Sequence, residues 1–310
     1  MVVAIIDLGT NTFNLLISEI NSDKEETTLF ETKISVKLGE GGINKKNILP
    51  VAFERGIEAL KKYKTIIETY KAEKIIAFAT SAIREASNGN DFIYKAQQET
   101  GITVQAISGN EEAEYIYYGV RDAVKFSDKH SLIMDIGGGS TEFIIADREN
   151  IIWKQSYLLG AARLLEKFNP SDPIKKNEIK KIEDYLRQEL SSLLEAVRKF
   201  GVTELVGSSG SFDSLAEMIA YKFYSLDILK NKTEYLFNIE ECAVIYKQIL
   251  RSTKAERIKI KGLVEMRVDM IVVSSIFVNF IFRELNLKKM RLSAFSLKEG
   301  VLWKFKNNIQ

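Results

Sequence analysis

The spacing of hydrophobic residues divides the chain into two halves, each of which opens with three strands and continues with helices and strands in alternation. In the first half, short apolar runs bounded by polar turns indicate strands, and apolar residues at every third or fourth position indicate helices. The expected strands are Val2–Asp7, Phe13–Glu19, Thr27–Val36, Lys74–Thr80 and Ile102–Ile107, and the expected helices are Val51–Tyr70, Asp91–Thr100 and Asn110–Lys125.

The same order of elements restarts at Ser131. Residues 203–220 (TELVGSSGSFDSLAEMIA) predict a strand, a Gly/Ser turn and a helix. The other expected strands are Ser131–Asp135, Glu142–Asp147, Ile151–Tyr157 and Met290–Ala294, and the other helices are Gly160–Phe168, Lys176–Phe200, Ile239–Ser252, Gly262–Leu285 and a last one from Leu297.

Two stretches that open the halves match one another in sequence. IIDLGTNTFNLLI begins at Ile5 and IMDIGGGSTEFII begins at Ile133. The matching positions, at a constant offset of 128 residues, are Asp7 and Asp135, Gly9 and Gly137, and Thr12 and Ser140. We therefore expect a duplicated α/β core that faces a cleft. The two domains would cover residues 1–125 and 126–310, with the boundary at Lys125–Lys129.

The amino-acid composition restricts the possible catalytic groups but says less about the fold. The 310 residues are 45% hydrophobic and 28% charged, with a net charge of +2, which fits a globular protein and argues against a general nucleic-acid binder. Cys242 and His130 are the only residues of their types, which excludes a disulfide framework, a His-based triad and a multi-histidine metal site. The groups left for catalysis are then carboxylates, hydroxyls and backbone amides, with a hard cation as a further option.

Membrane and export signals are not evident in the sequence. The N-terminus enters the first strand without a basic region or cleavage site, so we expect no signal peptide. The longest apolar stretch, Met270–Phe282, is too short and too polar to span a bilayer and is typical of a buried helix. We expect a cytoplasmic protein that binds no membrane.

Three turns are rich in glycine and hydroxyl residues, which expose backbone N–H groups and form anion cradles. We call Gly9–Thr12 the first cradle, Gly137–Thr141 the second and Gly207–Ser211 the third; the third opens a helix, whose dipole adds positive potential. The alternative for each is a tight turn without a ligand. The candidate phosphate-binding residues are Gly9, Thr10, Asn11, Thr12, Gly137, Gly138, Gly139, Ser140, Thr141, Gly207, Ser208, Ser209, Gly210 and Ser211.

Five segments, taken together and in order, resemble the exopolyphosphatase / guanosine pentaphosphate phosphohydrolase (Ppx/GppA phosphatase) family. They are AIIDLGTNTFNLLI, FATSAIREASNG, ISGNEEAEYIYYGV, MDIGGGSTEF and VGSSGS, and GAARLLEKF and SAFSLKEGVL are also similar to family segments. The resemblance implies two duplicated ribonuclease-H-like domains of the actin-like ATPase superfamily flanking a cleft. It also implies the short two-domain form, with the C-terminal helix, residues 297–310, packed back on the first domain.

The NEEAE segment supplies the candidate general base. On its own, Glu111 and Glu112 at a helix start are typical of residues that favour the helix N-terminus. The family resemblance implies that Glu112, the second glutamate of NEEA, orients and deprotonates the attacking water. Glu111 is the adjacent alternative, and the sequence does not separate the two.

The resemblance also implies a metal and a phosphate-binding arginine. Similar aspartates in the superfamily hold Mg²⁺, which suggests Asp7 and Asp135 as ligands, with Glu142 as a further acid near the metal. Arg84 resembles a family arginine near the phosphate, and its guanidinium suits phosphate oxygens. The alternatives are an exposed strand position for Glu142 and a surface ion pair with Glu85 or Glu111 for Arg84.

These features predict a phosphoanhydride hydrolase that releases terminal phosphate from inorganic polyphosphate or guanosine pentaphosphate, with Mg²⁺ or another hard divalent cation. Two alternatives remain open: an ATP-dependent kinase of the same superfamily, and a non-catalytic protein that binds polyphosphate or an alarmone. The sequence does not choose between the two substrates and leaves a homodimer open. No nucleic-acid partner is expected.

Overall fold

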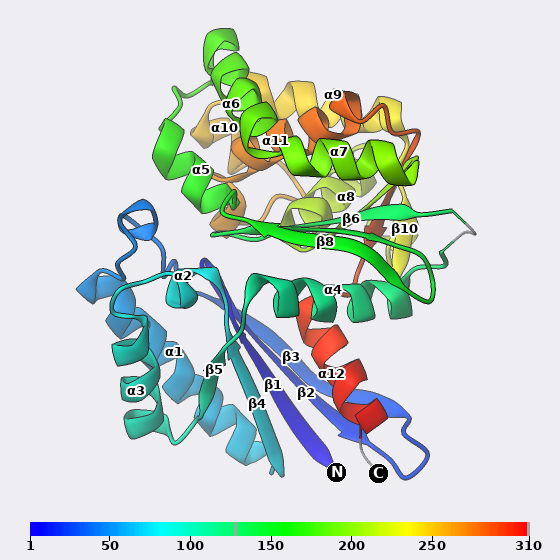
Figure 1. Ribbon diagram of the computed structural model, residues 1–310. Helices are drawn as coiled ribbons and strands as arrows, with labels where there is room; N and C mark the ends of the chain where they lie inside the picture. Colours follow the sequence, from blue (N-terminus) through cyan, green and yellow to red (C-terminus); the bar gives the residue numbers. More distant parts are fainter. Residues whose placement is uncertain (127–128, 309–310) are drawn as a thin grey trace.

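The computed structural model describes residues 1–126 and 129–308, whose strands form two mixed sheets (Figure 1). In the first sheet the order is β3-β2-β1-β4-β5; β1 pairs antiparallel with β2 and parallel with β4. The strands are β1 (Val2–Leu8), β2 (Thr12–Ile20), β3 (Glu26–Ser35), β4 (Lys74–Ala79) and β5 (Val104–Ala106).

The second sheet repeats this arrangement and adds one strand at its edge. Its order is β10-β11-β9-β6-β7-β8, in which β6 pairs antiparallel with β7 and parallel with β9. The series β8-β7-β6-β9-β11 is therefore the counterpart of the series β3-β2-β1-β4-β5. The strands are β6 (Ser131–Ile136), β7 (Thr141–Ala146), β8 (Ile151–Tyr157), β9 (Glu204–Ser208), β10 (Glu234–Leu236) and β11 (Lys289–Ser293).

Helices connect the strands and cover the sheets. The α-helices are α1 (Pro50–Thr69), α2 (Ser81–Arg84), α3 (Gly89–Thr100), α4 (Gly109–Ala123), α5 (Ala161–Phe168), α6 (Lys176–Glu189), α7 (Ser191–Phe200), α8 (Gly210–Phe223), α9 (Ile239–Arg251), α10 (Lys254–Arg257), α11 (Ile271–Glu284) and α12 (Leu297–Asn308). Short 3₁₀ turns are η1 (Ile43–Lys45), η2 (Leu226–Ile228) and η3 (Glu265–Arg267).

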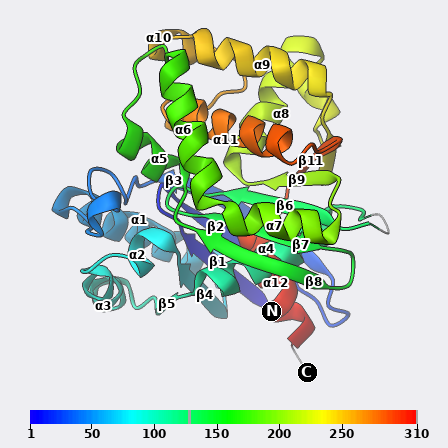
Figure 2. The ribbon, with the colours of Figure 1, turned by 45° about the horizontal axis from the view of Figure 1, so that its top comes forward.

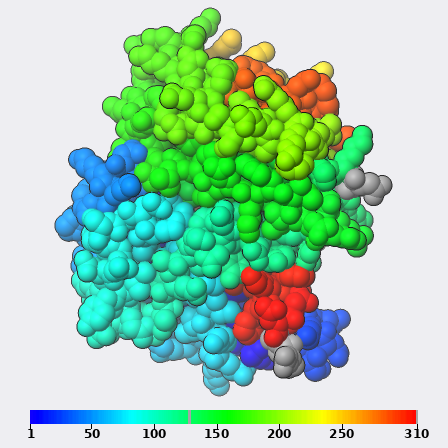
Figure 3. All heavy atoms as spheres, viewed as in Figure 1, coloured from blue at the N-terminus to red at the C-terminus, as the bar shows by residue number. Residues whose placement is uncertain are grey.

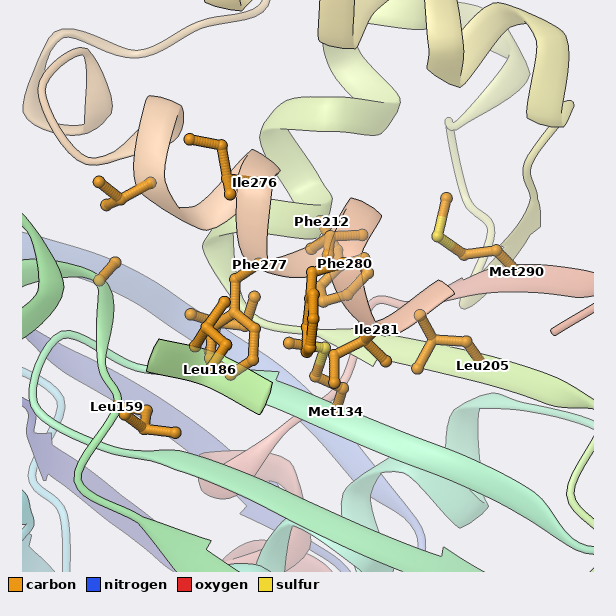
Figure 4. Close-up of a cluster of buried hydrophobic side chains, with 14 of the residues drawn as sticks. Met134, Leu159, Leu186, Leu205, Phe212, Ile276, Phe277, Phe280, Ile281 and Met290 are labelled. Carbon is orange, nitrogen blue, oxygen red and sulfur yellow. The ribbon is translucent and has the colours of Figure 1, made fainter. Parts of the chain in front are cut away.

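Helices and sheets alternate in layers, so the central strands of each sheet are buried on both faces, whereas the edge strand β3 is largely exposed. Helices α1 and α3 cover the outer face of the first sheet, α4 and α12 lie between the sheets, and α5–α9 with α11 cover the outer face of the second (Figures 1 and 2). Figure 4 shows the core on the outer face of the second sheet, where Phe212 of α8, Phe277 and Phe280 of α11, and Met134 of β6 lie together. Burial on both faces explains why β1 and β6 are almost entirely apolar.

The last helix of the chain lies in the layer between the two sheets and contacts the first half. Helix α12 packs against α4 and against strands β1 and β2, and in Figure 3 its surface borders that of the first half. The approach is close, because a Cβ on Gly300 would lie 1.7 Å from the carbonyl oxygen of Tyr115. The expected return of the last helix to the first sheet is therefore present in the fold.

Two expected helices differ from those in the structure. Lys176–Phe200 is broken at Leu190, whose ψ of 19° ends α6 and whose buried side chain lets α6 and α7 follow separate paths over the second sheet. The helix expected from Gly262 begins only at Ile271, because Gly262 has a φ of +86° and the intervening residues form η3. The expected domain boundary includes residues 127–128, which lie outside the described residues.

The apolar stretch Met270–Phe282 falls almost entirely within α11, whose side chains are largely buried against the second sheet. Among the described residues, no helix combines the length and the apolar character needed to cross a membrane. The expectation of a buried core helix is confirmed.

Candidate active site

Both halves contribute residues to one cavity of about 270 Å³ at the C-terminal ends of β1 and β6. Its walls come from the loops that follow β1, β6 and β9, from the first turn of α4 and from the segment before α12. The sequence-predicted residues that line it are Asp7, Gly9, Thr10, Asn11, Thr12, Glu112, Asp135, Gly137, Gly138, Gly139, Ser140, Ser209, Gly210 and Ser211.

The first and second cradles are built alike and touch each other. The amide of Gly9 donates to the carbonyl of Thr12 at 3.1 Å, and the amide of Gly137 donates to that of Ser140 at 3.0 Å. A Cβ on Gly138 would lie 3.0 Å from Thr10 Cβ, which is tighter than ordinary van der Waals contact. Glycine at this position therefore lets the two turns meet at the floor of the cavity.

Three residues predicted for the cradles lie behind the lining. Gly207 is covered by the ring of Phe212, which a Cβ would approach to 2.1 Å. The hydroxyl of Ser208 donates to Asp135 Oδ2 at 2.6 Å, and the hydroxyl of Thr141 donates to the carbonyl of Leu159 at 3.1 Å. These residues support the site from behind, since Phe212 covers Gly207 and the hydroxyls of Ser208 and Thr141 are already bonded within the protein.

Ser209 opens α8 in a backbone conformation that usually requires glycine. Its φ is 67° and its ψ is 177°, and its hydroxyl donates to the carbonyl of Ile136 at 3.0 Å. Such a conformation costs on the order of 1–3 kcal/mol and persists only where the surroundings enforce it. In this conformation the first residues of the helix, Gly210 and Ser211, line the cavity.

Asp7 and Asp135 face the cavity from equivalent strand ends. Asp7 Oδ2 accepts from Asn14 Nδ2 at 2.9 Å, whereas Oδ1 is buried and has no partner among the described residues. Burial raises the pKa of Asp7 to about 6 against this hydrogen bond, and the charge of Asp135 adds to the rise. Burial also raises the pKa of Asp135, although Ser208 and Ser296 donate to its Oδ2 at 2.6 and 2.5 Å.

Glu112 lies on the cavity wall at the start of α4 and is only 7% exposed. Its Oε2 accepts from Arg84 Nη1 at 2.8 Å. Burial raises the pKa of Glu112 to about 7, and the charge of Arg84 limits the rise. Arg84 also donates to the carbonyl of Ile107 at 2.9 Å and pairs with Glu85, so its side chain orients Glu112 and does not line the cavity.

Glu111 points away from the cavity and caps α4. The amide of Ser108 donates to Glu111 Oε2 at 2.8 Å, and the amide of Glu111 donates to the hydroxyl of Ser108 at 3.2 Å. These hydrogen bonds lower the pKa of the exposed Glu111 carboxyl. The two adjacent glutamates thus have different surroundings, which the sequence did not distinguish.

Glu142 is buried rather than exposed, at 1% accessibility, and lies opposite Asp135 in the β6–β7 register. Its Oε1 accepts from the hydroxyl of Ser156 at 2.6 Å. Burial and the nearby charge of Glu112 raise the pKa of Glu142 well above its ordinary value. It stands behind the lining, next to the acids that face the cavity.

Basic residues in the lining were largely missed by sequence reasoning. Arg267 of η3 and Lys298 of α12 both face the cavity, as does Lys33 of β3. Arg267 lay within a segment expected to be a regular helix, and nothing in its sequence context marks it. Lys298 stands in the SAFSLKEGVL segment quoted for the resemblance, which was the one available signal. These cations offset part of the acidic charge around the cavity.

Residues 16–308 match the Ppx/GppA phosphatase family. The chain belongs to this family. An exopolyphosphatase from Cytophaga hutchinsonii superposes with a TM-score of 0.95 at 37% sequence identity, over 100% of this chain and 99% of its own. The Ppx/GppA family member from Aquifex aeolicus gives a TM-score of 0.80 at 25% identity, again over 100% of this chain and 99% of its own.

A curated relative of this Ppx/GppA family member is much longer. The bifunctional 3-dehydroquinate synthase/phosphatase of Fusobacterium nucleatum is 33% identical over 284 residues, which cover 88% of this chain and 42% of that protein. The chain therefore spans less than half the length of this relative. The structural comparisons confirm the fold class: two ribonuclease-H-like α/β domains of the actin-like ATPase superfamily on either side of a cleft.

The donors at this Ppx/GppA cavity fit a hard divalent cation held largely through water. Asp7 and Asp135 face the cavity, and the buried Oδ1 of Asp7 is left without a partner among the described residues. Within those residues, no group of three or more His, Cys, Asp and Glu side chains is arranged to hold a metal ion. Mg²⁺ commonly uses one or two carboxylates, several waters and substrate phosphates, which this donor set matches.

Proposed function

We propose that this Ppx/GppA phosphatase is a phosphoanhydride hydrolase that releases the terminal phosphate of inorganic polyphosphate by metal-assisted attack of water. The single observation that carries the proposal is Glu112, a buried carboxylate with a pKa near neutrality on the wall of a cavity floored by two anion cradles. A base of that pKa is suited to proton transfer near pH 7.

Glu112 acts on the attacking water. Arg84 holds Oε2, which leaves Oε1 for a water molecule that enters the cavity. The water oxygen bonds to the terminal phosphorus, Glu112 accepts a proton, and the bond from that phosphorus to the bridging oxygen breaks. The shortened chain leaves with the bridging oxygen. Phosphoryl transfer of this kind depends mainly on positioning and charge stabilisation, which asks only modest help from the base.

The cradles and the basic residues hold the substrate in line with this water. Residues of the first and second cradles line the cavity, and backbone amides and hydroxyls of such turns can donate to phosphate oxygens. Lys33, Arg267 and Lys298 balance the charge of the polyanion. Asp7 and Asp135 would hold Mg²⁺, which when bound neutralises charge that develops on the leaving phosphate.

The size of a neighbouring pocket favours polyphosphate over guanosine pentaphosphate. A small pocket of about 90 Å³ between α8, α9 and α11 adjoins the cavity at Ser211 and Ser274. Sites for drug-sized ligands occupy roughly 300 Å³ or more, so this pocket is too small for a nucleoside in the observed conformation. The same argument weighs against an ATP-dependent kinase. The likeness to the Cytophaga hutchinsonii exopolyphosphatase also supports polyphosphate.

Phosphate release from long-chain polyphosphate and from guanosine pentaphosphate, measured side by side with Mg²⁺ and with excess chelator, tests the proposal. We expect Mg²⁺-dependent release that is faster from polyphosphate. Faster release from guanosine pentaphosphate would reverse the substrate assignment, and full activity in chelator would exclude the metal role. Binding of polyphosphate without any hydrolysis would favour the non-catalytic alternative.

A further inference from the structure

The first turn of α5 anchors the second cradle from behind. The amides of Ala161 and Ala162 donate to the carbonyl oxygens of Gly137 and Gly138, at 2.9 Å in each case. The C=O and N–H of a trans peptide point in opposite directions because the unit is planar. With these carbonyls held on α5, the amides that follow them in the cradle are turned the other way, where a phosphate can accept from them.

The side chain of Arg163 extends this anchoring to the other half of the molecule. Its Nε donates to the carbonyl of Gly139 and its Nη1 to the carbonyl of Ile43, each at 2.9 Å, and the residue is 8% exposed. Ile43 belongs to η1, in the loop after β3. In that loop the amide of Gly39 donates to the carbonyl of Thr10, in the first cradle, at 3.1 Å. One guanidinium therefore connects the supports of both cradles.

A further contact fixes α5 to the same loop. Asn44 Nδ2 donates to the carbonyl of Arg163 at 3.2 Å, and the Asn44 amide donates to Glu166 at 3.3 Å. Gly138 already lies against Thr10, so the two turns have no room to move closer together. A shift of the loop relative to α5 would change the distance between the cradles directly.

We infer that Arg163 is a positioning residue that sets the spacing of the two cradles, and hence the fit of a polyanion whose neighbouring phosphates bind one to each. The inference rests on the proposed phosphate binding and adds a residue to it. Arginine suits this role because its planar fork donates in fixed directions to two acceptors at once. A lysine keeps the charge but carries its donors on a single nitrogen, so it does not reproduce the two separate nitrogens that bond the carbonyls of Gly139 and Ile43.

The test compares Arg163→Lys and Arg163→Gln with Arg291→Lys as a matched control. The side chain of Arg291 is 12% exposed, and like Arg163 it donates to a main-chain carbonyl, that of Lys125. Arg291 does not line the cavity, and its side-chain hydrogen bonds reach neither the first nor the second cradle. The probe is imidodiphosphate, a pyrophosphate analogue that resists hydrolysis, titrated in a calorimeter with Mg²⁺. Thermal unfolding of each variant is recorded in parallel.

We expect both Arg163 variants to bind the probe about tenfold more weakly than the wild type, equivalent to about 1.4 kcal/mol. Arg291→Lys should bind the probe like the wild type, even if its Tm falls as much as that of the Arg163 variants. In hydrolysis assays Arg163→Lys should raise KM about tenfold and leave the pH profile of Glu112 in place, a split that general destabilisation would not produce. Asn44→Ala, at an exposed position, should weaken binding in the same direction by a smaller factor and serves if the Arg163 variants fail to fold.

Wild-type affinity in Arg163→Lys and in Asn44→Ala would overturn the inference, and so would equal losses in Arg163→Lys and Arg291→Lys. Wild-type affinity in Arg163→Lys with a loss only in Arg163→Gln would assign the effect to charge and also overturn it. The binding measurement requires no turnover. A wild type that binds the probe but hydrolyses neither substrate would refute the proposed reaction alone.

Discussion

Replacing Asp7 by asparagine should stabilise the protein at alkaline pH while it removes activity. Burial, aided by the charge of Asp135, raises the pKa of Asp7 to about 6 from an ordinary value of 3.8. The folded carboxyl therefore holds its proton more tightly than the unfolded one. The contribution of Asp7 to stability is greatest when the group is protonated, and it is lost as the pH rises from about 4 through 6.

The magnitude follows from the two pKa values. The difference between about 6 and 3.8 corresponds to about 3 kcal/mol as an upper limit at pH 8, and to less than about 1 kcal/mol near pH 4. Asparagine keeps the size of the side chain and an oxygen that accepts from Asn14 Nδ2. We therefore expect Asp7→Asn to unfold at higher urea than the wild type at pH 8, and at nearly the same urea at pH 4.

The assay is urea unfolding at both pH values in chelator, repeated at pH 8 with Mg²⁺. If Asp7 helps to hold the ion, Mg²⁺ should stabilise the wild type and have little effect on the variant. Asp122→Asn, at an exposed position on α4, is the control for the substitution itself. A variant that is no more stable than the wild type at pH 8, or that differs equally at both pH values, would refute the reasoning about burial.

Three further predictions address the proposed mechanism. Glu112→Gln should lower kcat by roughly 10²–10⁴-fold, the usual scale for loss of a general base, and leave polyphosphate binding intact; Glu111→Gln, which only loosens the cap of α4, should do much less, and a reversed order would move the base to Glu111. In the wild type, kcat/KM should fall about tenfold for each pH unit below the pKa of Glu112, about 7, and a flat profile from pH 5 to 8 would exclude Glu112 as the base. Gly138→Val places side-chain carbon against Thr10 at 3.0 Å or less, so KM should rise; unchanged KM and kcat would remove the second cradle from the mechanism.

Most strands and the duplication of the core could be predicted from sequence because two signals agreed, whereas the order of the strands within each sheet was not predicted. The offset of 128 residues between the Asp7 and Asp135 stretches indicated duplication, and the apolar runs marked the same three strands at the start of each half. Helix boundaries were less accurate where tertiary packing decides them. The break at Leu190 falls in a continuous helical pattern, since the buried leucine is apolar in either arrangement.

Residues of the cavity wall could be predicted from sequence where neighbouring residues form a recognisable motif. Cradle glycines and hydroxyls stand next to one another in sequence, so Gly138 and Ser209 were found. The partners that tune the acids are distant in sequence: Ser296 lies 161 residues from Asp135, whose Oδ2 accepts from its hydroxyl. Periodicity and composition carry no information on such pairs. The separate roles of Glu111 and Glu112 likewise depend on which one the fold buries.

The two halves differ in the residue that lies opposite each cavity aspartate. Asn14 faces Asp7 across β1 and β2, and Glu142 faces Asp135 across β6 and β7, at the equivalent place in the repeat. In the first half the partner donates a hydrogen bond to the carboxylate, which eases its ionisation. In the second half the partner is another buried acid, Glu142, whose own pKa is raised by burial, by the charge of Glu112 and by the charge of Asp135. Directly opposite side chains lie about 5 Å apart, so a proton held on Glu142 relieves that repulsion. The duplicated fold thus places a hydrogen-bond donor opposite one buried aspartate and a second buried acid opposite the other, so the two equivalent strand ends carry different numbers of ionisable groups.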